Sequence, residues 1–208
     1  MNRREFTAVM AAAAGFGMAP AMPLLAQTAE PEALVIPDMI LGNPDSKVVL
    51  TEYASFTCPH CANFHSAVFK DLKRDYIDNG KIKFVYREVY FDRYGLWAAM
   101  VARCGGEMRY FGIADILYST QKEWAGSDDP ATVVGNLKKI GLTAGMDEAT
   151  LNACLNDGPK AQAMVEKYQT DTAADDISST PSFVLNGVKH SNMGYAELAK
   201  LLDEELAK

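Results

Sequence analysis

The stretch KVVLTEYASFTCPHC, residues 47–61, decides the fold of this chain. Residues 47–54 are β-branched and apolar on both faces, which is typical of a central strand covered on each side by helices. The motif Cys58-Pro59-His60-Cys61 follows directly and begins a segment with helical periodicity, whose apolar residues are Phe64, Val68, Phe69, Leu72 and Tyr76. Asp78-Asn79-Gly80 ends that helix, and residues 81–89 (KIKFVYREV) have the pattern of a second strand. This order predicts a βαβ unit with two parallel strands.

Helical periodicity then dominates from residue 95 to about residue 176. Trp97 and Cys104 belong to the first apolar stripe, and further helices are expected over residues 110–124, 131–140, 147–155 and 160–173. Strand character returns at 182–185, Asn186-Gly187 predicts a hairpin to 188–190, and an amphipathic helix is expected over 195–206. The pattern therefore predicts an α/β domain formed by residues 47–94 and 177–208, with residues 95–176 as an inserted helical subdomain.

Residues 1–26 have the pattern of an export signal. Basic Arg3 and Arg4 precede a weakly apolar run to Met18, and small residues offer cleavage after Ala21 or Ala26. Both the general secretory route and the twin-arginine route fit these residues. Residues 27–46, which show no clear period and end in a turn, are expected to form an N-terminal arm. We therefore expect a mature protein that is released into the periplasm.

The composition predicts one substantial hydrophobic core and argues against nucleic acid as a partner. The chain has 208 residues, 49% of them hydrophobic, and a formal net charge of -7. Binding to phosphates needs clustered Lys and Arg, which this acidic chain lacks. Export also implies an oxidising compartment, in which the four cysteines are expected to form disulfides.

The CPHC motif combines two cysteines with different surroundings. Cys58 stands at the N-terminus of the predicted helix, where unpaired N–H groups and the helix dipole favour a thiolate. Cys61, one turn later, can close a small disulfide with Cys58 but receives less of that stabilisation. His60 is expected to stabilise the thiolate further. Stabilising the Cys58 thiolate stabilises the reduced protein, so the disulfide form is predicted to oxidise other thiols.

The motif has two other interpretations. Cys58 and Cys61 could hold a metal with His65 as a third ligand, but a structural zinc site needs a fourth ligand and usually a second CxxC or HxH group. A purely structural bridge is disfavoured because a loop of this size hardly constrains the unfolded chain.

Thr180-Pro181 precedes the second strand pair, and a cis peptide bond there would expose backbone polar groups to a visiting peptide strand.

The strand, the CPHC motif at a helix start, the helical insertion and Thr180-Pro181 before a hairpin together resemble the thioredoxin superfamily, specifically DsbA-type proteins. The resemblance spans residues 47–206 and implies a thioredoxin-like fold with an inserted helical subdomain. It implies that Cys58, Pro59, His60 and Cys61 form the redox centre and that Pro181, with Thr180, takes the cis-proline role. DsbA proteins are themselves a standard example of an acidic cysteine with an oxidising disulfide. For this chain we predict the direction of both effects, a lowered pKa of Cys58 and an oxidising Cys58–Cys61 disulfide.

The resemblance also implies partners. These are reduced, unfolded exported proteins as clients and a quinone-linked membrane reoxidase of the DsbB type, with no cofactor beyond the redox-active disulfide. A monomer is expected. A disulfide isomerase or reductase of the DsbG or DsbC type is the alternative within the same class, although residues 27–46 are too short for the dimerisation domain of such proteins. From a different class, the alternative is a periplasmic metal-binding or copper-handling module that uses Cys58, Cys61 and His65.

Glu52 and the second cysteine pair complete the candidate residues. Strand alternation puts Glu52 on one face with Leu50 and Ala54, so an ionisable group is expected beneath the motif. By resemblance, Glu52 handles the proton of Cys61. Cys104 and Cys154 lie on apolar helical stripes, and a disulfide between them, closing about 50 residues, would contribute about 4 kcal/mol. The aromatic residues Phe64, Phe69 and Trp97 are expected in the core, and the histidines His65 and His190 are expected to be surface or structural residues.

Overall fold

The computed structural model describes residues 34–208, so the predicted export signal and the first part of the predicted arm lie outside the described residues. Within the described part, five strands form one mixed sheet in the order β1-β3-β2-β4-β5. The strands are β1 (Met39–Gly42), β2 (Val49–Ala54), β3 (Lys83–Glu88), β4 (Ser182–Leu185) and β5 (Val188–Ser191). Strands β2 and β3 are parallel, as the βαβ pattern predicts, and the other neighbours are antiparallel.

Strand β1 corrects the interpretation of residues 27–46 as an arm. Met39 to Gly42 pair antiparallel with β3, and Met39 is buried while Ile40 is exposed. A strand of four residues between Pro37 and Pro44 is too short to show a convincing alternation in the sequence. Its stability comes from pairing with a strand about 40 residues later, which no local pattern reveals.

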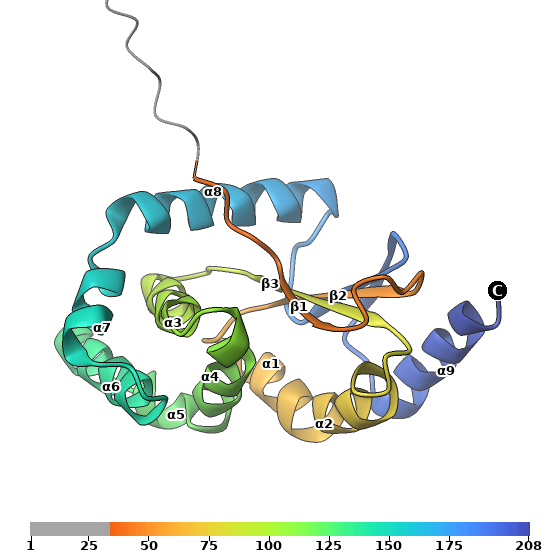
Figure 1. The fold of residues 1–208 in the computed structure, drawn as a ribbon, viewed down its shortest axis with the longest axis horizontal. Coiled ribbons are helices and arrows are strands. Elements are labelled where there is room, and N and C mark those ends of the chain that lie inside the picture. The colour runs from red at the N-terminus through yellow and green to blue at the C-terminus, as the bar shows by residue number, and fades with distance from the viewer. Residues whose placement is uncertain (1–33) are drawn as a thin grey trace, which may run out of the picture. The chain divides into compact units, whose positions relative to one another are not determined.

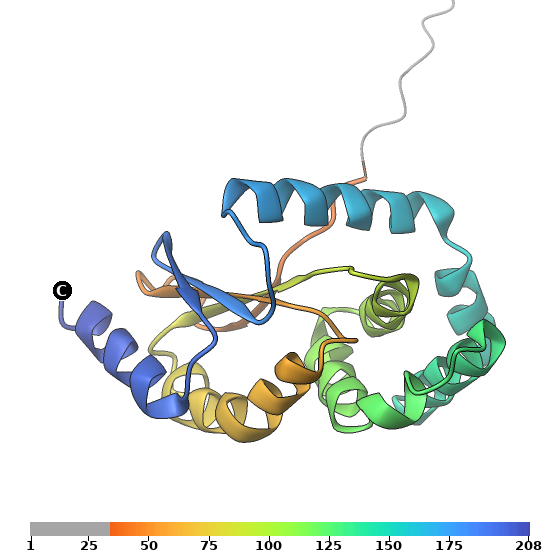
Figure 2. The same cartoon turned by 180° about the vertical axis from the view of Figure 1, so that it is seen from behind.

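Helices cover both faces of the sheet (Figures 1 and 2). One face carries the helical run made of α1 (Pro59–Phe64), η1 (His65–Phe69), α2 (Lys70–Leu72) and η2 (Lys73–Ile77), beside α9 (Tyr195–Leu206). The opposite face carries α8 (Gly158–Ala174). Tyr53 of β2 donates a hydrogen bond to Asp175 near the end of α8, whereas the preceding residue, Glu52, faces His65 of η1. The side chains of adjacent residues in β2 thus point to opposite faces of the sheet, as strand geometry requires.

The remaining helices lie between β3 and β4 in the chain. They are α3 (Arg93–Cys104), α4 (Glu107–Ser119), α5 (Gln121–Trp124), α6 (Pro130–Thr143) and α7 (Glu148–Leu155), followed by α8. Aspartate side chains accept backbone N–H groups at the starts of four of them, namely Asp92, Asp129, Asp147 and Asp157. Such caps satisfy donors that a helix start leaves unpaired, and they mark boundaries that periodicity alone leaves vague. The helix predicted over 110–124 is interrupted at Thr120 and forms α4 and α5.

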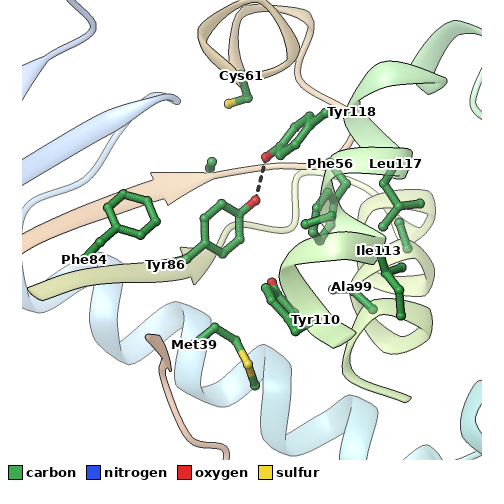
Figure 3. Packing of buried hydrophobic residues seen from close by; sticks show 14 of the residues in the cluster. Met39, Phe56, Cys61, Phe84, Tyr86, Ala99, Tyr110, Ile113, Leu117 and Tyr118 are labelled. Atoms are coloured by element: carbon green, nitrogen blue, oxygen red, sulfur yellow. Dashed lines mark hydrogen bonds between the residues drawn. The ribbon is translucent and has the colours of Figure 1, made fainter. Parts of the chain in front are cut away.

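The sheet and the inserted helices share one hydrophobic core. Figure 3 shows Tyr86 of β3 reaching toward Tyr118 of α4, and the ring of Tyr86 also packs near that of Tyr110 from the same helix. The hydroxyl groups of Tyr86 and Tyr118 are hydrogen-bonded at 2.5 Å across this boundary. The inserted helices are therefore packed into the same core as the sheet, which fixes the position of α4 and α5 relative to β2.

A buried ion pair adds to this packing. Arg103 of α3 makes two hydrogen bonds of 2.6 and 2.7 Å to the carboxylate of Glu88 at the end of β3. Tyr110 also donates to Glu88, and Arg103 donates to the backbone oxygen of Pro37. Both charged side chains are almost fully buried, so each depends on the other for its opposite charge.

Cys104 of α3 and Cys154 of α7 form a disulfide, with their Cα atoms 5.9 Å apart. The bridge joins two helices through cysteines that are 50 positions apart in the chain.

In the part of the chain that the structure describes, there is no helix long and apolar enough to cross a membrane.

Candidate active site

Cys58 occupies the position directly before the first turn of α1. Its backbone is extended, with φ -81° and ψ 118°, and Pro59 follows at the first helical position. Proline is suited to that position because its fixed φ is helical and its missing N–H would be unpaired there in any case. Cys58 is partly exposed, and Pro59 and His60 are exposed. The nucleophile candidate is thus presented at the surface by the strand-to-helix turn.

The surroundings of Cys58 favour its thiolate. A hydrogen bond from Cys61 is the largest cause that lowers the pKa of Cys58, and further lowering comes from Thr180 and from the backbone N–H groups of Cys61 and His60. Partial burial opposes these contacts, and the resulting pKa is about 5. At neutral pH Cys58 is therefore a thiolate, which is both a nucleophile and a good leaving group.

Cys61 differs sharply from Cys58. It is fully buried, and its pKa is raised well above that of an ordinary thiol by burial, by the bond to Cys58 and by the charge of Glu52. Both cysteines are free thiols here, so the structure represents the dithiol form. The two sulfurs are suited to different roles, since that of Cys58 is charged and accessible whereas that of Cys61 is neutral and enclosed.

Glu52 lies beneath the motif, fully buried. Among the described residues, neither carboxylate oxygen has a hydrogen-bond partner. His65 comes within 3.4 Å through its Nε2 atom, although the two groups are not aligned as a hydrogen bond. His65 itself is buried, so of the two expected positions, surface or structural, the structure excludes the surface one, because the helix turns this residue toward Glu52 of β2 and Tyr118 of α4.

The loop before β4 completes the site. The Thr180-Pro181 peptide bond is cis, and the Thr180 carbonyl accepts a hydrogen bond of 3.5 Å from the Cys58 thiol. The Thr180 hydroxyl is buried without another partner among the described residues, so it is free to donate to the thiolate once Cys58 has lost its proton. Thr180, which is 122 positions from Cys58 in the chain, thus contacts the Cys58 sulfur.

Gln121 is a site residue that the sequence did not indicate. From the start of α5, its Nε2 atom donates to the backbone oxygens of Phe56 at 2.8 Å and Cys58 at 3.0 Å. The side chain is buried, so these bonds anchor the turn that carries the nucleophile to the inserted helices. No local signal distinguishes this glutamine, because its partners lie more than 60 residues earlier in the chain.

Within the described residues, no group of three or more His, Cys, Asp or Glu side chains is arranged to hold a metal ion. His65, the third ligand of the metal alternative, faces Glu52 instead. What the arrangement does provide is a reactive thiolate, a protonated partner thiol and a buried carboxyl group close to the partner thiol.

A family model described as Thioredoxin matches residues 35–204. The chain therefore belongs to the thioredoxin family, and its fold is the expected thioredoxin-like fold with a helical insertion. Within that family, the proteins it resembles are of the DsbA type. The crystal structure of Wolbachia pipientis alpha-DsbA1 matches with a TM-score of 0.76 at 27% identity, covering 84% of this chain and 94% of that one.

Sequence relatives agree with this placement. A Rickettsia bellii protein, named as a protein-disulfide oxidoreductase, is 36% identical over 170 residues, which is 81% of this chain and 64% of the relative. Disulfide bond formation protein D of Bacillus subtilis is 26% identical over 178 residues, covering 80% of this chain and 76% of that protein. The chain thus spans less than two thirds of the length of the Rickettsia bellii relative.

Proposed function

We propose that this chain is a thiol-disulfide oxidoreductase that introduces disulfide bonds into exported proteins through Cys58 and Cys61. The observation that carries the proposal is the contrast between the two sulfurs, an accessible thiolate with a pKa of about 5 and a buried thiol with a raised pKa. A stabilised thiolate favours the reduced protein, so its disulfide accepts electrons readily.

The reaction begins with the Cys58–Cys61 disulfide. A client thiolate attacks the Cys58 sulfur, the bond between the two cysteines breaks, and Cys61 leaves and takes up a proton. A second client thiolate then attacks the mixed disulfide, and Cys58 leaves as its stabilised thiolate. The client gains one disulfide and gives up two electrons, which remain on the protein as a thiolate and a thiol.

The other site residues have supporting roles in this proposal. Pro181 and Thr180, which lie beside Cys58, hold the backbone of the client. The exposed imidazole of His60 stands next to the thiolate and favours it further. Glu52 supplies and removes the proton of Cys61.

The partners follow from the same proposal. Clients are reduced, unfolded proteins in the periplasm, reached after removal of the N-terminal export signal. A quinone-linked membrane reoxidase of the DsbB type restores the disulfide, so that no cofactor is required on this chain.

The test mixes the oxidised chain with a reduced, unfolded disulfide protein and compares it with the Cys58→Ser variant. We expect stoichiometric transfer of disulfides by the unmodified chain and none by the variant. The ultraviolet absorbance of the thiolate, followed against pH, should titrate far below the ordinary value of about 8.5. Rearrangement of wrong disulfides without net oxidation would indicate an isomerase, and stoichiometric metal uptake without disulfide transfer would indicate a metal-binding module.

A further inference from the structure

Glu52 forms a buried polar pair with His65, a residue to which the proposed exchange reaction assigns no role. The carboxylate is fully enclosed, the imidazole side chain is only 4% exposed, and the closest contact between them is 3.4 Å from Nε2 to Oε1. Neither group has a hydrogen-bond partner through these atoms among the described residues. Burying unsatisfied ionisable groups is costly, so the pair calls for a functional reason.

The imidazole is held in one orientation by its neighbours. Its ring is stacked between Tyr118 at 4.1 Å and Phe69 at 4.5 Å, measured between ring centroids. Tyr118 also bonds to Tyr86, which fixes the stack against the sheet (Figure 3). These contacts hold the plane of the His65 ring, with its Nε2 atom 3.4 Å from Oε1 of Glu52.

A cavity of about 380 Å³ lies on the outer side of this pair, between α1 with η1 and α4 with α5. His65 lines it together with Asn63, Ser66, Asp115 and Ser119, and these four are exposed. A polar cavity of this size admits several water molecules. His65 thus lies between a buried carboxyl group and space that is open to solvent.

We propose that His65 carries protons between Glu52 and the solvent in this cavity, so that the enclosed Cys61 can lose and regain its proton during disulfide exchange. The inference rests on the proposed oxidoreductase function and deepens it. An imidazole is suited to the task because its ordinary protonation change falls near neutral pH. His65 does not touch the reacting sulfurs and acts through Glu52.

The proton balance is simplest when the reduced protein is oxidised by glutathione disulfide. The Cys58 thiolate attacks that disulfide, forms a mixed disulfide and releases one glutathione thiolate. Cys61 then gives its proton to the Glu52 carboxylate, attacks the Cys58 sulfur and releases the second glutathione thiolate. Glu52 passes the proton to His65, and His65 passes it to solvent. Two electrons move from the cysteines to glutathione disulfide, and one proton leaves the protein.

Several other ionisable groups face this path. Tyr86 of β3 and Tyr118 of α4 adjoin the imidazole ring, and burial raises the pKa of both hydroxyls, so they remain neutral. At the cavity, the charged side chains are Lys70, Asp115, Lys122 and Glu123. These groups carry two charges of each sign, so the charges that line the cavity balance.

The experiment follows the two steps separately. The reduced chain is mixed with glutathione disulfide, quenched with acid at short times and weighed by mass spectrometry over a range of pH. In His65→Gln we expect the mixed disulfide to form at the unmodified rate, because that step uses only Cys58. Its conversion to the Cys58–Cys61 disulfide should slow by about 10-fold or more, because Cys61 cannot shed its proton.

Three further variants separate a relay from simple packing. His65→Ala opens a path from the cavity to Glu52, and added imidazole should restore the second step in proportion to its concentration. Ser119→Trp keeps His65 but obstructs the cavity, so the second step should slow there too. His190→Gln changes a histidine on β5 that does not line the cavity, and as the matched control it should behave as the unmodified chain.

The outcomes are distinguishable. If the unmodified chain forms neither the mixed disulfide nor the final disulfide, the proposed function itself fails. If the unmodified chain forms both, but His65→Gln converts the mixed disulfide as fast as the control, the relay is refuted and the oxidoreductase function stands. If His65→Gln does not fold, the same result in Ser119→Trp refutes the relay. Slowing of both steps equally, or slowing of the second step without imidazole rescue, would also overturn the relay.

Discussion

The acidic Cys58 thiol should make the stability of the reduced protein depend on pH in a way that one substitution removes. Cys58 has a pKa of about 5 in the folded protein, far below the ordinary value of a thiol. Because the folded pKa is depressed, the thiolate stabilises the folded state most at and above the unfolded pKa. That contribution diminishes as the pH falls and is lost once the pH passes below about 5.

The magnitude follows from linkage. At pH 7, two units above the folded pKa, the thiolate contributes at most about 3 kcal/mol to the free energy of unfolding. Cys58 is partly exposed, so solvent screening reduces this to about 1–2 kcal/mol. By pH 4 both folded and unfolded thiols are protonated and the contribution is near zero. Above pH 8, the raised pKa of Cys61 acts in the opposite direction, so measurements belong between pH 4 and pH 8.

The assay is urea denaturation of the reduced chain and of reduced Cys58→Ser at several pH values. Both proteins are kept under the same reductant, so that any effect on Cys104 and Cys154 cancels. The stability difference should be about 1–2 kcal/mol larger at pH 7 than at pH 4. A difference that stays constant across this range, or grows toward acid pH, would refute the view that the folded structure stabilises the Cys58 thiolate.

Three further predictions concern contacts that support the site. Gln121→Ala should lower the free energy of unfolding by about 2 kcal/mol, because two carbonyls of the nucleophile turn lose their donor, and it should slow disulfide transfer to a reduced client. Cys104→Ser combined with Cys154→Ser should cost about 4 kcal/mol, measured by urea denaturation against the oxidised chain, and a loss below about 1 kcal/mol would show that the bridge constrains little. Arg103→Met should cost about 3–5 kcal/mol because it leaves Glu88 buried without its partner, and thermal unfolding at unchanged pH checks this. Retained stability in that variant would mean that Glu88 finds another partner.

Much of the fold could be read from local patterns. The β2 strand, the helix that begins at Pro59, the parallel β3 strand and the hairpin after Leu185 each have a signal within their own residues. The interrupted helix at Thr120 and the short strand β1 had no such signal. β1 depends on pairing with β3, and the break at Thr120 lies inside a run whose periodicity continues.

The candidate site divides in the same way. Cys58 and Cys61 were identifiable because a cysteine at a helix start experiences backbone N–H groups only a few residues away. His65 was expected as a surface or structural residue because its helix shows no sign of what faces it, whereas the structure buries it against Glu52. Gln121 stayed unnoticed because a glutamine in a helical segment carries no local sign of a distant partner.

The sequence by itself determined the βαβ unit, the helical insertion and the C-terminal hairpin and helix. It also determined the placement of the CPHC motif at a helix start and the direction in which that placement shifts the pKa of a thiol. These properties depend on backbone geometry and on side chains that lie close to one another along the chain. Only the tertiary structure decided how deeply Cys61 is enclosed, which carbonyl and hydroxyl reach Cys58, and that Glu52 meets His65 beside a cavity that is open to solvent. Burial and contact between distant segments arise when the sheet and inserted helices pack into one core, and no local stretch of sequence contains that information.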